Sequence, residues 1–360
     1  ANRFVGWAIP RPIRSAIRDS LLQRHAQLFI PYWERPTTYL NGSAEPVRVG
    51  FVGSGTYARH HMKALSSMPG VELFAILTTG GPRVSEVAPL YGIRRIFSDP
   101  QEFLSQNEVD CYVVVVPGHR IKDVAKRCLN TGKPVLLEKP AGLSSQETME
   151  LVDAAESSGT FGMVGMNRRF YSVVEHGLAA LATCGPIRGA VLEIPEAISK
   201  DRRSGRLAEV EYDHWMFRNS VHGIDLLRFV MGDPVRVHSL ARPNTEFNNA
   251  SASFACVVEH GLGRVSTILG AWDTPPGFRL KVIAERGSVE FEPLERGWFT
   301  NEKGFRAPIK VDPTDLAFRM GVFFQDLRFI EGVKEGRKPS FPACLLPDAY
   351  KTNLFVEQIL

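Results

Sequence analysis

The distribution of apolar residues changes character near residue 167. Before that point, short β-branched runs such as VRVGFVG (47–53), VELFAIL (71–77) and DCYVVVVP (110–117) are separated by stretches with helical spacing. Continuous apolar runs are typical of parallel strands that are covered on both faces. Strands that alternate with helices predict a doubly wound, parallel α/β sheet, which we expect to occupy residues 46–166.

After residue 167 the pattern predicts mainly strands. GAVLEI (189–194) and GRVSTILGAW (263–272) are two of several β-like segments that follow one another through turn residues. Helices are expected at only three places here: about 219–231, 317–335 and 347–360. Consecutive strands without crossover helices predict a largely antiparallel sheet. Residues 167–360 should therefore form an α+β domain for substrate binding and oligomerisation, and its last helix is expected to pack back on the first domain.

Residues 1–45 form a segment of different composition, with six arginines against three acidic residues. Ile13, Ile17 and Leu21 lie four residues apart, which predicts one amphipathic helix. We interpret the segment as an arm that packs on its own or a neighbouring subunit. Disorder and an arginine-rich targeting peptide remain alternatives.

Composition narrows the class of protein. The 360 residues are 44% hydrophobic and 23% charged, with a net charge of +4, as in an ordinary globular protein. The chain lacks the clustered basic face that nucleic acid or a membrane surface would require, and no apolar run reaches the ~18 residues of a membrane span. Five scattered cysteines without a CxxC pair indicate reduced thiols and a cytoplasmic location.

A glycine-rich motif directly follows the first strand and opens a helix. The motif has the form G-x-G-x-x-A and consists of Gly53, Ser54, Gly55, Thr56, Tyr57 and Ala58. The first glycine permits a tight turn, the second lets backbone amides approach a pyrophosphate, and the alanine lets helix and strand pack closely. Within a βαβ series this motif predicts a Rossmann-type dinucleotide site with the anion at the helix N-terminus.

The end of the second strand bears on the choice between NAD and NADP. An acidic residue there would bind the ribose 2′-hydroxyl of NAD, but this chain has Thr78 and Thr79. Arg83 follows and could meet the 2′-phosphate of NADP. The pattern slightly favours NADP, with NAD as the alternative.

The segment PVLLEKP (134–140) places a lysine where a strand of the same sheet ends. Loops at the carboxyl ends of such strands line the ligand crevice, so Lys139 should point to the nicotinamide. A lysine whose pKa is lowered by burial can exchange a proton with an alcohol or carbonyl.

At this point the chain resembles the glucose–fructose oxidoreductase / inositol dehydrogenase / MocA family of NAD(P)-dependent oxidoreductases. The segments that carry the resemblance are VGFVGSGTYARHHMKAL, VVVVPGHR, KPVLLEKP, VGMNRRF and HGIDLLRFVMG, together with the closing residues from FFQDLRFIEG onward. They cover residues 47–360 in the family's order. The resemblance implies a Rossmann domain followed by a domain with an open, mostly antiparallel sheet that commonly mediates oligomers.

The resemblance also implies roles for individual residues. Lys139 would be the catalytic proton donor or acceptor, and His222 would be a substrate-side acid/base or hydrogen-bonding group. Pro117, His119 and Glu138 would lie against the cofactor. Arg168 would contact the substrate.

One position departs from the family's pattern. Many relatives carry an aspartate or asparagine four residues before the histidine, whereas this chain has Arg218, with Asn219 next. Arginine does not act as a base, but it can clamp a carboxylate or phosphate. We therefore expect Arg218, or Asn219 in a shifted register, to bind a substrate with an anionic group, such as a sugar acid or nucleotide sugar. Asp225, three residues after His222, is expected at the substrate site, orienting His222 or capping backbone.

These observations predict an oxidoreductase that moves a hydride between a nicotinamide and a carbinol or carbonyl carbon of a sugar-like substrate. A tightly bound, cycling cofactor that supports elimination or epimerisation is one alternative, and a non-catalytic NAD(P)-binding sensor is another. Asp213, His214 and His222 would permit a metal site, but their spacing matches no tested pattern and no metal is expected. We expect a homodimer or homotetramer formed through the second sheet, with the N-terminal arm contributing.

Overall fold

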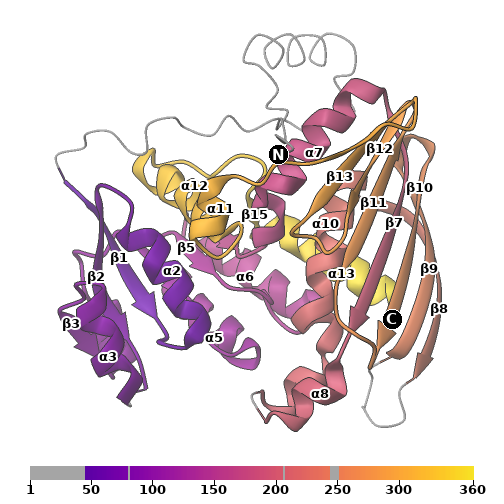
Figure 1. Ribbon diagram of the computed structural model, residues 1–360. Coiled ribbons are helices and arrows are strands. Elements are labelled where there is room, and N and C mark those ends of the chain that lie inside the picture. The colour runs from indigo at the N-terminus through magenta and orange to yellow at the C-terminus, as the bar shows by residue number, and fades with distance from the viewer. Residues whose placement is uncertain (1–44, 80–81, 206, 244–250) are drawn as a thin grey trace.

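The computed structural model describes residues 45–79, 82–205, 207–243 and 251–360 (Figure 1). The N-terminal arm, including its expected helix, lies outside the described residues. In sequence order the strands of the first sheet are β1 (Val47–Val52), β2 (Val71–Leu77), β3 (Arg95–Phe97), β4 (Cys111–Val114), β5 (Val135–Leu137), β6 (Gly162–Val164) and β15 (Cys344–Leu345). Their spatial order is β15-β6-β5-β4-β1-β2-β3.

The first sheet confirms the expected Rossmann-like architecture. Strands β1 to β6 pair in parallel, and only the short edge strand β15 is antiparallel, to β6. The helices of this unit are α2 (Thr56–Ser66), α3 (Pro82–Leu90), α4 (Pro100–Leu104), α5 (Gly118–Leu129) and α6 (Ser145–Ser157). The order of strands reverses between β1 and β4, and such a switch point is where doubly wound sheets bind their ligands.

Two C-terminal helices complete this layer. Helix α12 (Val322–Lys334) packs against α2, and α13 (Leu346–Ile359) packs against α6 and α10 (Val221–Met231). In Figure 1 the yellow α13 lies between the two sheets. The start of α6 is defined locally, because the Ser144 hydroxyl accepts a hydrogen bond from the Glu147 N–H at 3.1 Å. The Glu147 carboxylate in turn accepts one from the Leu143 N–H at 2.8 Å.

The second sheet confirms the expected mostly antiparallel arrangement. Its strands are β7 (Ile187–Glu196), β8 (Pro234–Pro243), β9 (Ser251–His260), β10 (Arg264–Trp272), β11 (Arg279–Ala284), β12 (Gly287–Phe291), β13 (Gly297–Asn301) and β14 (Arg306–Pro308). They lie in the order β14-β13-β12-β11-β7-β10-β9-β8, and every pair is antiparallel except β7 with β10. Alternate residues of β10 are buried, so one face of the sheet covers the core and the other is open.

The expectation of only three helices after residue 167 is wrong. The structure adds α7 (Ser172–Leu181), α8 (Ile198–Arg203), α9 (Glu209–Asp213) and α11 (Pro313–Ala317). Three of these span at most six residues, too few to show a period. In α7 the buried Val174, Leu178 and Leu181 do have helical spacing, so that signal was present in the sequence.

The boundaries of the expected helices also differ. The helix predicted over 317–335 begins only at Val322, because Gly321 adopts a φ of 75° and its backbone packs against the Asn167 carbonyl. The helix predicted over 219–231 is preceded by a turn of π-helix, Met216–Ser220. π-Helical turns are uncommon and are frequently found at functional sites.

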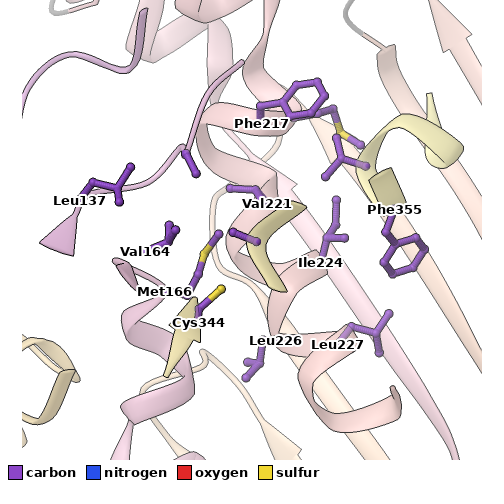
Figure 2. Packing of buried hydrophobic residues seen from close by; sticks show 14 of the residues in the cluster. Leu137, Val164, Met166, Phe217, Val221, Ile224, Leu226, Leu227, Cys344 and Phe355 are labelled. Atoms are coloured by element: carbon purple, nitrogen blue, oxygen red, sulfur yellow. The ribbon is translucent and has the colours of Figure 1, made fainter. Parts of the chain in front are cut away.

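The main apolar core joins the ends of the parallel strands to α10 and α13 (Figure 2). Leu137, Val164 and Met166 from the first sheet lie on one side, and Val221 and Ile224 from α10 lie on the other. Each is at most 2% exposed, so each contributes roughly 1.5–3 kcal/mol of apolar burial. This apolar contact holds the end of β5 against the start of α10. Lys139 follows β5 and His222 lies at the start of α10, so the same contact sets their relative position.

Candidate active site

The nucleotide motif lies at the switch point between β1 and β4. Gly53 has a φ of 102°, and a Cβ atom there would lie 2.1 Å from the Val115 carbonyl oxygen. Only glycine therefore fits this turn. The Gly53 N–H donates to the Leu77 carbonyl at 3.0 Å, which fixes the turn to the end of β2.

The start of α2 fits the pyrophosphate of a dinucleotide. Gly55 is the N-cap, no side chain of the described residues caps the helix, and a Cβ atom on Gly55 would meet no atom within 4 Å. The free N–H groups of the first turn, which begins at Thr56, thus face open space that an anion can fill. Ala58 is fully buried, as close helix–strand packing requires.

The end of β2 carries hydroxyl groups in place of a carboxylate. The Ser54 and Thr78 hydroxyls lie 3.3 Å apart, and Thr79 is exposed beside them. Arg83 belongs to α3, but its side chain lies outside the described part of the chain.

Lys139 lies just beyond the end of β5 and is half-buried. Its Nζ donates a hydrogen bond to the Arg218 carbonyl oxygen at 3.0 Å, so the C-terminal part of the chain orients it. Burial, and next the positive charge of Arg218, lower the pKa of Lys139 to about 7, while Glu138 opposes this change. An amine in this condition can donate or accept a proton near neutral pH.

His222 lies in the first turn of α10 and is 8% exposed. Its Nδ1 has no hydrogen-bond partner within the described ranges. Burial lowers the pKa of His222 well below its ordinary value, and the charge of Lys139 lowers it further. Three arginines add to that effect: Arg168, Arg218 and Arg319. The imidazole is therefore neutral at pH 7.

Arg168 and Arg319 are brought together by a contact between distant segments. The Asn167 amide donates to the Met320 carbonyl at 2.9 Å, so the residues that precede Met320 and follow Asn167 are neighbours. The Arg168 guanidinium lies 4.3 Å above the Phe278 ring. Within the described residues, neither arginine forms an ion pair. The sequence analysis did not single out the exposed Arg319, because only this tertiary contact brings it near Arg168 and His222.

The π-helical turn carries Arg218 and Asn219, which were both expected to bind substrate, and each contacts a different carboxylate of the chain. The Arg218 Nε lies 3.3 Å from the Glu211 carboxylate, so a carboxylate of the chain already engages its guanidinium. The amide of Asn219 donates to Glu196, as do the Ser220 hydroxyl and the Trp272 indole. Burial raises the pKa of Glu196 to about 7. Glu196 ends β7 and was not expected at the site.

Asp225 does not orient His222, contrary to expectation. Its carboxylate accepts two hydrogen bonds from Arg169, at 2.6 and 2.8 Å, and one from Thr352 at 2.9 Å. Arg169 also reaches Asp348 of α13 at 2.6 Å. Residues three apart on a helix lie roughly 60° apart around its axis. Asp225 accordingly faces the joint between the two sheets.

A buried histidine links the Glu138-Lys139 segment to α12. His61 is fully buried, its Nδ1 lies 2.9 Å from Asp326, and its Nε2 lies 3.2 Å from Glu138. Burial alone would lower the pKa of His61, but Asp326 and Glu138 raise it to about 10, so the ring is an imidazolium. Glu138 therefore binds His61. Tyr57 packs edge-on against the same ring at 5.7 Å.

Pro117 and His119 flank the start of α5 beside the switch point. Pro117 is the exposed N-cap, and the His119 Nδ1 lies 3.6 Å from Glu211. No group of three or more His, Cys, Asp or Glu side chains in the described residues could hold a metal ion. In the same ranges, no helix is both long and apolar enough to cross a membrane.

The glycine turn lies at the switch point of the first sheet, and the half-buried Lys139 follows β5 of the same sheet. This arrangement is typical of a dinucleotide-binding enzyme. Residues 47–166 match the model of an oxidoreductase family with an NAD-binding Rossmann fold, and residues 184–290 match the GFO/IDH/MocA C-terminal domain. The chain belongs to the GFO/IDH/MocA family, as the sequence resemblance predicted.

Individual relatives are distant but are matched over most of their length. The chain is 22% identical to 4-carboxy-2-hydroxymuconate-6-semialdehyde dehydrogenase of Sphingobium sp., over 85% of this chain and 96% of the relative. It is 24% identical to scyllo-inositol 2-dehydrogenase (NAD(+)) of Bacillus subtilis, over 81% and 88% of the two chains. An oxidoreductase of Agrobacterium radiobacter, solved with NAD+, L-tartaric acid and magnesium, superposes with a TM-score of 0.72 at 16% identity, covering 86% of this chain and 94% of that one.

These similarities support the expected class of activity. The protein is an NAD(P)-dependent oxidoreductase that acts on CH–OH groups, in a family of sugar-type dehydrogenases.

Proposed function

We propose that the protein interconverts a carbinol and a carbonyl in a sugar-like substrate that carries an anionic group. Bound nicotinamide would exchange the hydride at C4 with the substrate carbon. Lys139 would take the hydroxyl proton during oxidation or return it during reduction. Neutral His222 would hold the same oxygen by a hydrogen bond.

The observation that carries this proposal is the state of Lys139. Burial lowers its pKa to about 7, and the Arg218 carbonyl orients it from 3.0 Å. Proton transfer is most effective when the pKa of the group lies near the working pH. An ordinary surface lysine would be almost fully protonated at pH 7.

The anionic group is supported by the charges around His222. Lys139, Arg168, Arg218 and Arg319 all act on this ring. Arg218 is offset by Glu211, whereas Arg168 and Arg319 form no ion pair within the described residues. An unpaired cation in a partly buried position is costly, so a negatively charged ligand would stabilise Arg168, and the exposed Arg319 would add to the attraction. The carboxylated substrate in the Sphingobium relative's name and the L-tartaric acid bound in the Agrobacterium structure agree with this proposal.

The experiment is a turnover screen with matched substrates. NAD(P)H absorbance is followed with neutral polyols, levoglucosan, 2-hydroxy acids, L-tartrate and sugar acids. Lys139→Met should bind cofactor and lose turnover by roughly 10²–10⁴-fold. Retained turnover would exclude Lys139 as the acid/base group, and a parent protein inactive on the whole panel would favour the sensor alternative.

Arginine variants test the anionic group separately. Arg168→Leu and Arg319→Leu should each raise KM for an acidic substrate far more than for its neutral analogue. Arg337→Leu, an exposed arginine paired with Glu335 after α12, is the matched control. Equal changes in KM for acidic and neutral substrates would refute the anionic class. The same comparison with Arg218→Leu tests whether its guanidinium also contacts substrate.

For the cofactor we propose NADP(H) over NAD(H). Thr78 and Thr79 place no carboxylate at the end of β2 to repel a 2′-phosphate. Titration of the protein with NADPH and NADH, followed by cofactor fluorescence, should give a lower Kd for NADPH. A lower Kd for NADH would contradict this preference. Arg83→Ala should weaken NADPH binding alone if that side chain meets the phosphate.

We further propose that a second copy of the chain covers the open face of the second sheet. Apolar side chains at least 39% exposed lie on five neighbouring strands of this sheet: Val191, Leu240, Val257, Val265, Leu269 and Ile283. Charged residues such as Glu193, Glu259 and Lys281 pair with them on the same face. Exposed apolar side chains that gather in this way favour association. Sedimentation velocity should show a dimer or tetramer that Leu269→Lys dissociates, whereas Leu316→Lys, on α11, should have no effect. A monomeric parent protein would refute the proposal.

A further inference from the structure

Glu211 is a buried carboxylate that joins the two halves of the site. It lies in α9, is 1% exposed, and accepts a hydrogen bond from the Gly118 N–H at 2.8 Å. Gly118 begins α5, so the carboxylate lies at the positive end of that helix. A Cβ atom on Gly118 would lie 2.9 Å from the Glu211 Oε1, so this close approach depends on glycine.

From Glu211, a chain of short contacts reaches the lysine. The same Oε1 atom lies 3.3 Å from the Arg218 Nε, and the Arg218 carbonyl accepts the hydrogen bond from the Lys139 Nζ at 3.0 Å. The other carboxylate oxygen lies 3.6 Å from the His119 Nδ1 and 3.4 Å from the Ala208 N–H. Glu211 thus contacts the cofactor-side loop and the π-helical turn at once.

The contact has a chemical consequence because Arg218 is a partly exposed cation beside an amine. Its side chain is 25% exposed, so without Glu211 it could turn into solvent. Four other ionisable groups face Lys139 from neighbouring elements: the charged Glu138 and Arg168, together with Glu196 and the neutral His222. Arg218 exerts the largest charge effect among them.

We propose that Glu211 is a positioning residue that holds the Arg218 guanidinium beside Lys139 and so governs the proton affinity of the catalytic amine. This inference rests on the proposed role of Lys139, and its test does not depend on turnover.

The test measures the titration of Lys139 directly. The cofactor-free protein is trace-labelled with acetic anhydride from pH 5.5 to 10, and the acetylation of Lys139 is quantified by peptide mass spectrometry. The parent should show half-maximal reactivity at about pH 7. A midpoint near that of an ordinary lysine, about 10.4, would instead refute the proposed function itself.

Side-chain variants then separate positioning from simple packing. Arg218→Gln keeps the backbone carbonyl and removes the charge, so the midpoint should rise by roughly one unit. Glu211→Ala releases Arg218 and should raise it nearly as much. Glu211→Gln keeps an acceptor for the Gly118 N–H but removes the charge that holds Arg218, so the midpoint should also rise.

The double variant Glu211→Ala/Arg218→Gln decides the matter. If Glu211 acts through Arg218, the double variant should titrate like Arg218→Gln alone. Glu209→Ala, an exposed residue of the same helix that pairs with Arg202, is the matched control and should titrate like the parent. Three results would overturn the inference: additive shifts in the double variant, no shift in Glu211→Ala, or a downward shift in Glu211→Gln. If Glu211→Ala does not fold, Glu211→Gln still decides by the sign of its shift: the midpoint rises if the carboxylate acts by holding Arg218, and it falls if the carboxylate acts on Lys139 by its own charge.

Discussion

Replacing Asp225 with asparagine should destabilise the protein strongly. The Asp225 carboxylate and the Arg169 guanidinium are 1% and 4% exposed and are joined by two hydrogen bonds of 2.6 and 2.8 Å. Asparagine keeps the volume but leaves the buried cation without its main counter-charge. Removing one partner of such a pair costs about 3–5 kcal/mol. With a urea slope of about 3 kcal/mol per molar, the unfolding midpoint should fall by roughly 1–1.7 M.

The assay is urea unfolding followed by tryptophan fluorescence, with Asp233→Asn as the control. Asp233 pairs with Arg228 in the same network but is half-exposed, so its loss should cost at most about 1 kcal/mol. Arg169→Met/Asp225→Leu removes both charges and should recover part of the loss. A midpoint for Asp225→Asn equal to that of Asp233→Asn would refute the structural role. Loss of turnover in fully folded Asp225→Asn protein would restore a role for this residue at the substrate.

Three further predictions follow from local geometry and charge. Because the Lys139 pKa is lowered to about 7, the neutral amine that accepts the proton dominates above pH 7. The kcat/KM for oxidation should therefore rise about tenfold per pH unit below pH 7 and level off above it. A flat profile from pH 5.5 to 8 in NAD(P)H absorbance assays would contradict this expectation. In Gly53→Ala, the alanine would need a φ of 102° and its Cβ would lie 2.1 Å from the Val115 carbonyl oxygen, which costs more than ~1–2 kcal/mol. Cofactor affinity measured by fluorescence should therefore fall sharply. Unchanged affinity would refute the requirement for glycine in this turn. Ser144→Ala removes the cap of α6 and should lower urea stability by about 1 kcal/mol, whereas Ser144→Asp should retain it; equal losses in both would exclude capping.

Features that depend on neighbours in the sequence were predictable. The alternation of strands and helices before residue 167, the glycine motif after β1 and the Ser144 cap are each set by residues within about ten positions of one another. Their physical causes are local, namely backbone sterics, hydrogen bonding at a helix end and the period of apolar residues. The turn at Gly53 and the position of Lys139 at the end of a strand could be predicted for the same reason, because each is set by neighbouring residues.

The roles of charged side chains were not predictable, because the partner of a charged side chain is often distant in sequence and close only in the folded structure. Asp225 was expected beside His222, yet its partner Arg169 lies 56 positions away. His61 binds Asp326 across 265 positions, and Glu211 meets Gly118 across 93. The parallel pairing of β7 with β10 also connects distant segments. The sequence by itself therefore determined which local elements form and where the glycine turn and the lysine lie on the first sheet. Only the tertiary structure decided which charged side chains are paired within the described residues. The physical reason is that electrostatic interactions depend on distance and burial in space, and the spacing of residues along the chain determines neither.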